Sequence, residues 1–373
     1  LAAACASPEA ADSGTPLAEA SCPFPAVDAL PEVADPPPLL RTWCGDAAVA
    51  DAEAWRDVRR PELQALFAHY VYGRTADVGG GPGDEAARGP VLDGQAELVE
   101  VDVPLGEGLA PMRLTLFRPV DVADPPVVLA LNACGAHSLV ADPAVSITRS
   151  WVESDCPPAD DTGRGGRADR WPVAALVARG WAVATVHQSD LAPDQPTLST
   201  EQGVIAGIDL GVGPDDRWGA VAAWAWGLTR AVDHLVVSGD VDPERVVVTG
   251  HSRRGKAALL AGALDDRVAV VAPHQSGTGG AALSRGDDPG RESVQAVAGF
   301  FPHWVREPLP RIRRPGGAPA RRPAPAPRAR RAASAAAHRR RGRRLGPPGG
   351  RPRRRRARRA RLAAARRHRP RPW

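Results

Sequence analysis

In its second half the chain reads Val246-Val247-Val248-Thr249-Gly250-His251-Ser252-Arg253-Arg254-Gly255-Lys256. The β-branched run predicts a buried strand, and the small residues after it predict a helix. A strand that turns sharply into a helix at a serine is the context of a nucleophile elbow, which exposes the hydroxyl above the sheet edge. We therefore predict that Ser252 is a nucleophile, although Arg254 stands where the second glycine of G-x-S-x-G usually lies. The alternative is a serine that only caps the helix.

Three basic residues, Arg253, Arg254 and Lys256, lie at the start of this predicted helix. Cations are unfavourable at the positive end of a helix dipole, so their presence needs a reason. Lys256 is also the only lysine of the chain. We predict that the group holds an anion, either a carboxylate or uronate-like substrate or a developing oxyanion. The alternative is a solvated basic patch paired with Asp265 or Asp266.

The rest of the pattern predicts strands that alternate with helices. Buried or alternating apolar runs predict strands at 97–103, 112–118, 127–131, 181–186, 245–249 and 268–272, whereas helical spacing predicts helices at 51–72, 171–178, 217–237 and 252–263. We expect the glycine-rich stretch 79–90 to be a loop and Gly73 to end the first helix. Together with the elbow, this pattern indicates an α/β-hydrolase fold: a mostly parallel sheet with helices on both faces and the active site at the carboxyl ends of the strands.

Charge and composition divide the chain into three parts. The formal net charge is +5, but residues 311–373 hold 25 arginines and no acidic residue, which leaves 23 basic against 43 acidic side chains in residues 1–310. We predict a tether at 1–38, the catalytic domain at 39–310 and an Arg/Ala/Pro-rich tail at 311–373. The tail has no apolar periodicity, so we expect it to be disordered.

The first residues, Leu1-Ala2-Ala3-Ala4-Cys5, resemble the end of a bacterial lipoprotein signal, or are a chance Ala-rich terminus. The first interpretation predicts a secreted or cell-surface protein with a lipid anchor at Cys5. Four cysteines remain, and they permit two disulfides or four free thiols: Cys22, Cys44, Cys134 and Cys156. No CxxC pair among them indicates a metal site. No apolar run approaches the roughly 20 residues of a membrane span.

Several separate motifs carry a family resemblance. Gly250-His251-Ser252-Arg253-x-Gly255-Lys256 resembles the signature of the glucuronoyl esterases, carbohydrate esterase family 15, which cleave esters of 4-O-methyl-glucuronic acid on xylan. Further family-like blocks lie before and after this signature in the right order, so that the resemblance spans about Trp43 to Trp304. These blocks are Arg179–Thr185, Ser189–Asp194, Ser276–Arg285, Arg291–Val294 and Phe301–Trp304.

The resemblance implies a role for each residue. Ser252 would be the nucleophile, Arg253 would stabilise the oxyanion, Lys256 and Glu292 would bind sugar hydroxyls, and Trp304 would pack on the uronate. The alternatives are surface positions for Lys256 and Glu292 and a core aromatic for Trp304. No cofactor or metal is implied. The partner would be an ester in glucuronoxylan or a lignin–carbohydrate linkage, and we expect a monomer.

A serine nucleophile needs a base that is oriented by an acid. One branch of the family carries the acid where this chain has Gln275, which has no charge. The family's histidine lies after the Trp304 block, in a segment like D-Q-H-x-L-L-A-L-x-A-P-R-P, which this chain lacks. We assign none of the nine histidines as the base, and we expect His251 and His303 only to shape the pocket.

A shifted reading frame would explain the tail. Codons allowed for Ala320 to Ala333 can read P-V-D-Q-H-Q-L-L-A-L-V-A-P one base later, which is similar to the family's histidine segment. We therefore hypothesise a frameshift between Trp304 and Arg321, and we expect the chain in its present frame to be inactive.

Three other functions remain open. The chain could be another carbohydrate esterase, such as an acetyl xylan esterase, but the pair of Arg253 and Lys256 favours a uronate. It could be an inactive α/β-hydrolase remnant. Nucleic-acid binding through the basic tail is disfavoured, because the tail has no interleaved aromatics.

Overall fold

The computed structural model describes residues 22–30, 36–78, 80–212, 217–284 and 292–306. All of them lie in one compact unit, Leu1–Arg321, and the second unit, Arg322–Trp373, lies outside the described residues. The predicted lipid anchor at Cys5 and the predicted tail at 311–373 also lie outside the described residues, as does the range of the hypothesised frameshift beyond Arg306.

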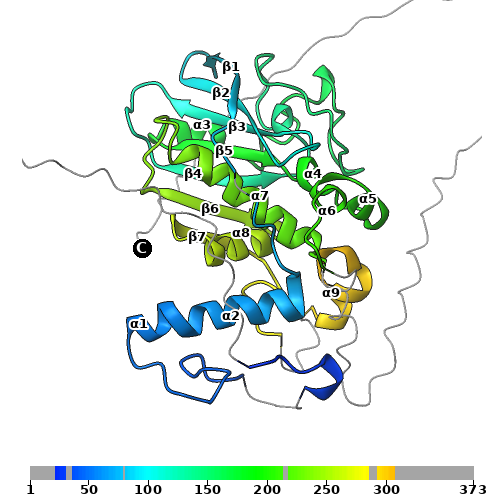
Figure 1. The fold of residues 1–373 in the computed structure, drawn as a ribbon. Coiled ribbons are helices and arrows are strands. Elements are labelled where there is room, and N and C mark those ends of the chain that lie inside the picture. The colour runs from blue at the N-terminus through cyan, green and yellow to red at the C-terminus, as the bar shows by residue number, and fades with distance from the viewer. Residues whose placement is uncertain (1–21, 31–35, 79, 213–216, 285–291, 307–373) are drawn as a thin grey trace, which may run out of the picture. The chain divides into compact units, whose positions relative to one another are not determined.

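The core of the described unit is a seven-stranded sheet in the order β1-β2-β3-β5-β4-β6-β7 (Figure 1). Strands β5, β4, β6 and β7 are parallel, whereas β1, β2, β3 and β5 pair in antiparallel fashion. This arrangement confirms the predicted α/β fold, and the parallel half contains the strand before Ser252. The strands are β1 (Asp84–Val91), β2 (Ala96–Val103), β3 (Met112–Pro119), β4 (Val127–Asn132), β5 (Ala182–His187), β6 (Val246–His251) and β7 (Val268–His274).

The prediction of a loop at 79–90 was wrong, because β1 begins at Asp84. Most of β1 is exposed or half-buried, and only Val91 at its end is buried. An edge strand of this kind is held by its pairing with β2 and not by an apolar face of its own. Its sequence therefore carries no strand pattern.

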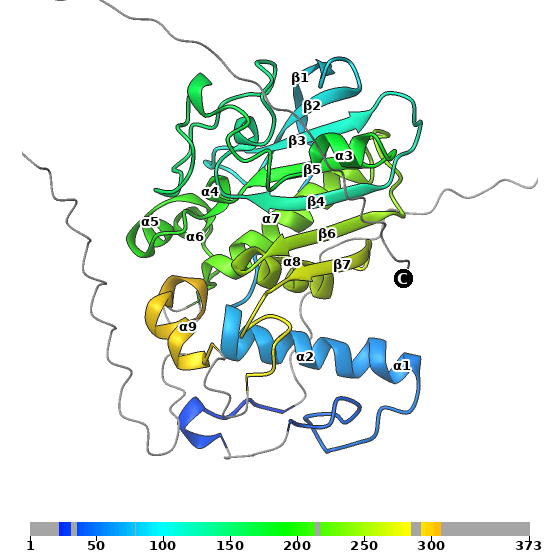
Figure 2. The same ribbon diagram turned by 180° about the vertical axis from the view of Figure 1, so that it is seen from behind.

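Helices lie on both sides of the sheet (Figures 1 and 2), and apolar side chains cover both of its faces. On β3, Leu114 and Leu116 join the larger core cluster, which includes α7 (Ala220–Leu235) and α8 (Arg253–Leu264). Phe117, which directly follows Leu116, joins the second cluster, which includes α3 (Val173–Val177). Because side chains alternate along a strand, the two clusters lie on opposite faces. The predicted cover of helices on both faces is thus confirmed.

The helical segment before the sheet was also predicted. It runs as α1 (Ala52–Ala54), a π-helical turn (Trp55–Arg59), α2 (Arg60–Phe67) and a second π-helical turn (Ala68–Tyr72). Gly73 ends it at a φ of 80°, where a side chain would also meet the backbone oxygen of Arg217. Gln64 Nε2 donates to Ala263 O of α8 at 2.6 Å, so the segment is tied to the helix that follows Ser252.

Short elements occupy the connections. They are the helices α4 (Gln188–Leu191), α5 (Pro196–Glu201), α6 (Gly203–Gly207) and α9 (Val294–Phe300), and the 3₁₀ turns Val27–Ala29, Ala136–Ser138, Asp161–Gly163 and Pro302–Trp304. Two disulfides, Cys22–Cys44 and Cys134–Cys156, resolve the open question of the four cysteines. Among the described residues, no helix is long and apolar enough to cross a membrane.

Candidate active site

Ser252 lies at a sharp turn between β6 and α8. Its φ of 57° and ψ of −122° are costly for a residue with a Cβ, and strained backbone of this kind clusters at functional sites. Gly255 allows the turn, because a Cβ there would lie 2.8 Å from Gly250 O. A Cβ on Gly250 would in turn collide with the Arg254 carbonyl. The elbow therefore forms with its second close glycine one position later than in G-x-S-x-G.

Ser252 stands at the N-cap position of α8, as its alternative role requires. Its side chain makes no capping hydrogen bond to α8. Ser252 is half-buried, and its Oγ makes no hydrogen bond within the described part of the chain. Its backbone N–H donates to His274 O at 2.9 Å, which fixes the turn to β7. The hydroxyl is thus positioned by the backbone and remains free to react.

The histidines near Ser252 have other contacts. His251 Nε2 lies 3.0 Å from Gln275 Oε1, and the His251 ring is 5.1 Å from that of His274. No histidine ring in the described ranges hydrogen-bonds Ser252 Oγ. Gln275 has a φ of 49°, and its amide oxygen is the partner of the His251 ring.

Arg253 reaches from the first turn of α8 to a buried carboxylate. Its Nη1 pairs with Asp194 Oδ2 and lies 3.4 Å from Glu153 Oε1. Its Nε is buried with no partner in the described residues, and its Nη2 also makes no hydrogen bond to them. The guanidinium lies over the Trp304 ring, 5.1 Å from the centroid. One nitrogen of the guanidinium, Nη1, is therefore anchored, whereas Nε and Nη2 have no hydrogen-bond acceptor among the described residues.

Arg254 points to a different set of partners. Its Nε donates to Gln188 Oε1 at 2.8 Å and its Nη2 to Glu153 Oε1 at 2.6 Å. Burial lowers the pKa of Arg254, while the charge of Glu153 opposes that shift. Neither arginine pairs with Asp265 or Asp266, so the alternative of a solvated patch is wrong: Asp265 binds Arg267, and Asp266 binds Arg60.

Lys256 is buried and fully engaged. Its Nζ donates to Ser276 O and Thr278 O, both at 2.6 Å, and to Glu292 Oε2 at 3.2 Å. An ammonium has three donors, so these acceptors use all of them. Lys256 thus holds the 276–278 loop and Glu292, whose side chain is 38% exposed, against α8. The structure brings these two predicted binding residues into direct contact.

Trp304 lies at the centre of a stacked cluster. It is only 3% exposed, its ring lies 3.8 Å from that of Phe301 at an interplanar angle of 4°, and its Nε1 donates to Asp194 Oδ1 at 2.7 Å. His303 Nε2 donates to the same oxygen at 2.9 Å. In this structure Trp304 is therefore a buried support beneath Arg253.

Asp194 and Glu153 are the two site residues that sequence reasoning missed. Asp194 stands in the quoted Ser189–Asp194 block, which could have pointed to it, whereas nothing in the sequence singles out Glu153. Burial would raise the pKa of Asp194, but its hydrogen bonds to His303 and Trp304 and the charge of Arg253 outweigh burial and lower it. Asp194 is consequently an ionised acceptor for three side chains.

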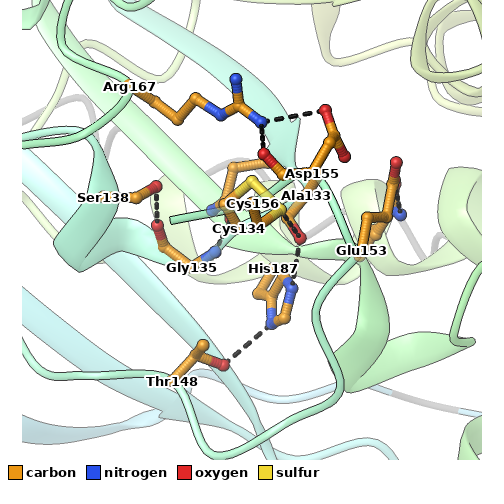
Figure 3. The surroundings of a disulfide bond; sticks show 12 residues. Ala133, Cys134, Gly135, Ser138, Thr148, Glu153, Asp155, Cys156, Arg167 and His187 are labelled. Carbon is orange, nitrogen blue, oxygen red and sulfur yellow. Dashed lines mark hydrogen bonds and ion pairs between the residues drawn. A yellow bond between two sulfur atoms is a disulfide. The ribbon is translucent and has the colours of Figure 1, made fainter. Parts of the chain in front are cut away.

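A disulfide holds the loop that carries Glu153. Cys134 lies two residues after the end of β4, and its bond to Cys156 ties the 153–156 segment to the carboxyl end of the sheet (Figure 3). Arg167 adds a salt bridge to Asp155 at 2.9 Å. These links fix the backbone from which Glu153 reaches Arg254.

A cavity of about 810 Å³ lies against β3, β4, β5 and the loop at 143–150. None of the five predicted site residues lines it. In the described residues, no group of three or more histidine, cysteine or acidic side chains is arranged to hold a metal ion.

Comparisons with known proteins point to one family. A family model described as "Glucuronyl esterase, fungi" matches residues 169–300. A solved structure of a promiscuous CE15 esterase from a marine bacterial metagenome is 34% identical, with a TM-score of 0.67, and the match covers 77% of this chain and 74% of that one. A glucuronoyl esterase from Solibacter usitatus is also 34% identical, with a TM-score of 0.67, over 76% of this chain and 73% of that one.

Curated relatives agree over shorter shares of their length. A carbohydrate esterase from an unknown prokaryotic organism is 35% identical over 286 residues, which are 74% of this chain but 65% of the relative. A 4-O-methyl-glucuronoyl methylesterase from Sodiomyces alcalophilus is 40% identical over 29% of this chain and 22% of its own. The chain thus spans less than two thirds of either curated relative. The sequence motifs, the elbow and the shared fold together show that this chain belongs to carbohydrate esterase family 15, the glucuronoyl esterases.

Proposed function

We propose that this chain is a serine carboxylic-ester hydrolase that cleaves esters of 4-O-methyl-glucuronic acid on glucuronoxylan or at lignin–carbohydrate linkages. The observation that carries the proposal is Ser252 at a strained elbow, followed in the chain by Arg253, whose guanidinium is only partly engaged. Relatives named 4-O-methyl-glucuronoyl methylesterase support the substrate class.

The proposed reaction is acyl transfer through the serine. Ser252 Oγ attacks the ester carbonyl carbon, the alcohol leaves with a proton, and water hydrolyses the acyl-enzyme. The negative charge on the carbonyl oxygen is stabilised by the free donors of Arg253 and by the start of α8, because fixed dipoles in a water-poor site act strongly on developing charge.

Substrate binding is proposed for Lys256, Glu292 and Trp304. Glu292 is the most accessible of them and can accept from sugar hydroxyls. Lys256 and Trp304 are almost fully buried, so a sugar reaches them by replacing a present contact. Lys256 could then exchange a loop carbonyl for a hydroxyl, and Trp304 would present the edge of its ring to the uronate.

We further propose that the catalytic base is encoded in the shifted frame. Support comes from Ser252 Oγ, which has no imidazole partner in the described residues, and from the histidine segment that codons for 320–333 permit. Reading the coding DNA across residues 300–350 tests this directly. A missing or extra base supports it, and an intact frame without that histidine segment overturns it.

We propose that the protein is exported from the cytoplasm and is secreted or held at the cell surface. Two disulfides support it, because such bonds persist in oxidising compartments. A lipid anchor at Cys5 and a monomeric state are part of the same proposal. Release of the protein from membranes by a lipase would support the anchor, and retention on membranes after lipase treatment would contradict it.

The substrate proposal is tested by comparing two esters. The frame-restored chain should hydrolyse benzyl glucuronate and leave acetylated xylose intact, and Ser252→Ala should abolish the activity. The reverse preference would establish an acetyl xylan-type esterase in place of the proposed one.

A further inference from the structure

Asp194 gathers three donors from two distant parts of the fold. Oδ2 receives Arg253 Nη1, and Oδ1 receives His303 Nε2 at 2.9 Å and Trp304 Nε1 at 2.7 Å. The Asp194 side chain is only 2% exposed, while that of Arg253 is 25% exposed. The carboxylate therefore lies beneath the arginine, on the side away from solvent.

The geometry of the fork decides which donors remain for a substrate. Asp194 uses Nη1 of Arg253, and the Trp304 ring lies under the guanidinium plane at 5.1 Å. A planar guanidinium that is anchored at one nitrogen and supported from one face has little freedom to rotate. Its Nη2, on the residue that follows Ser252, is then held in a fixed direction.

Glu153 is not the main partner of Arg253. Its Oε1 lies 3.4 Å from Arg253 Nη1 but 2.6 Å from Arg254 Nη2, and it also accepts from Gln188 Nε2 at 3.0 Å. Glu153 is thus the partner of Arg254. The short ionic contact of Arg253 is with Asp194.

We propose that Asp194 is a positioning residue that fixes the Arg253 guanidinium beside Ser252 and couples it to the turn that carries His303 and Trp304. The inference rests on the proposed esterase function for its catalytic consequence. Asp194 touches no reacting atom in this account and acts through Arg253. An oxyanion donor that is held before the reaction needs no reorganisation during it, so loss of the anchor should lower kcat more than it raises KM.

A double-mutant cycle separates this role from a merely structural one. Asp194→Asn keeps the size of the side chain and removes its charge. In the frame-restored chain with benzyl glucuronate as substrate, Asp194→Asn should lower kcat by about 10- to 100-fold and change KM by less than about threefold. In an Arg253→Gln background, the same change should cost less than about twofold, because the anchor then has nothing to position. Equal effects in both backgrounds would overturn the proposal.

Asp190→Asn is the matched control. Asp190 lies in α4, four positions before Asp194. It accepts hydrogen bonds from Arg113 N at 3.1 Å and from Ser150 Oγ at 2.5 Å and not from Arg253. Its effect on kcat should be small and the same with Arg253 or Gln at position 253. Non-additivity of Asp190→Asn equal to that of Asp194→Asn would show a general structural effect and overturn the proposal.

A second measurement needs no activity and uses the full chain of 373 residues. In nitrogen-15 NMR, a clamped guanidinium shows separate, slowly exchanging Nη signals. Asp194→Asn should merge those of Arg253 and leave those of Arg254, which Glu153 and Gln188 hold. If no ester is hydrolysed, the proposed function fails while this result still decides whether Asp194 anchors Arg253. Unchanged Arg253 signals would overturn the anchor.

Discussion

The Arg253 guanidinium lies over the Trp304 ring, 5.1 Å from its centroid, while the indole N–H donates to the same carboxylate that holds the arginine. Trp304→Phe keeps an aromatic ring and removes that donor. We expect it to lower the free energy of unfolding by about 1–3 kcal/mol, because a buried ionised acceptor loses a partner. Urea unfolding measures the change.

Trp43→Phe is the control for that substitution. Trp43 is 39% exposed, so the same change there should alter stability by less than about 0.5 kcal/mol. Equal effects at both positions would show that the Asp194 contact contributes nothing to stability.

The elbow predicts that replacing glycine by alanine changes stability very differently at positions 250 and 299. Gly250→Ala should lower stability by about 1–3 kcal/mol or prevent folding, because its Cβ would collide with the backbone of Arg254. Gly299→Ala in α9 meets nothing within 4 Å and should stabilise the chain by up to about 1 kcal/mol. Thermal unfolding of both variants checks this, and a harmless Gly250→Ala would contradict the described turn.

The two disulfides form a natural pair of variants, since each joins cysteines 22 residues apart. In the loop-entropy description each contributes about 3 kcal/mol, so replacing either pair by serine should cost a similar amount. Only loss of Cys134–Cys156 releases the loop that carries Glu153, so only that variant should also lower kcat. A comparable loss of kcat without Cys22–Cys44 would contradict a local role for Cys134–Cys156.

Stability should fall as the solution is acidified through the histidine range. Burial lowers the pKa of His234, and its Nδ1 accepts a hydrogen bond from Gly83 N at 3.1 Å. The unfolded chain therefore binds more protons below a pH of about 6.5, and stability decreases as the pH drops from about 7 to about 5. His234→Asn keeps an acceptor that does not titrate, so its urea-unfolding profile should depend less on pH in this range. An identical slope for both chains would contradict this source of the dependence.

Much of the fold could be predicted because its signals are local. The Val- and Ala-rich strands β4, β5 and β6 read as buried runs, and the elbow is a continuous sequence around Ser252. The prediction that β7 is a buried strand was wrong, because each of its residues is exposed or half-buried and Val270 is 53% exposed. Strand β1 could not be read, because Asp84, Glu85 and Arg88 face solvent at the sheet edge. The missed parts of the site are long-range contacts: Asp194 and Glu153 lie 59 and 100 positions before Arg253. No local periodicity encodes such pairings, nor the choice of partner among four cysteines.

The central claim is that Ser252 attacks a glucuronate ester with the aid of a base encoded in the shifted frame. Its most direct test is the rate of benzyl glucuronate hydrolysis by the frame-restored chain, its Ser252→Ala variant and the chain in its present frame. The account predicts turnover by the first alone. No turnover by the restored chain, or equal turnover after Ser252→Ala, would contradict it.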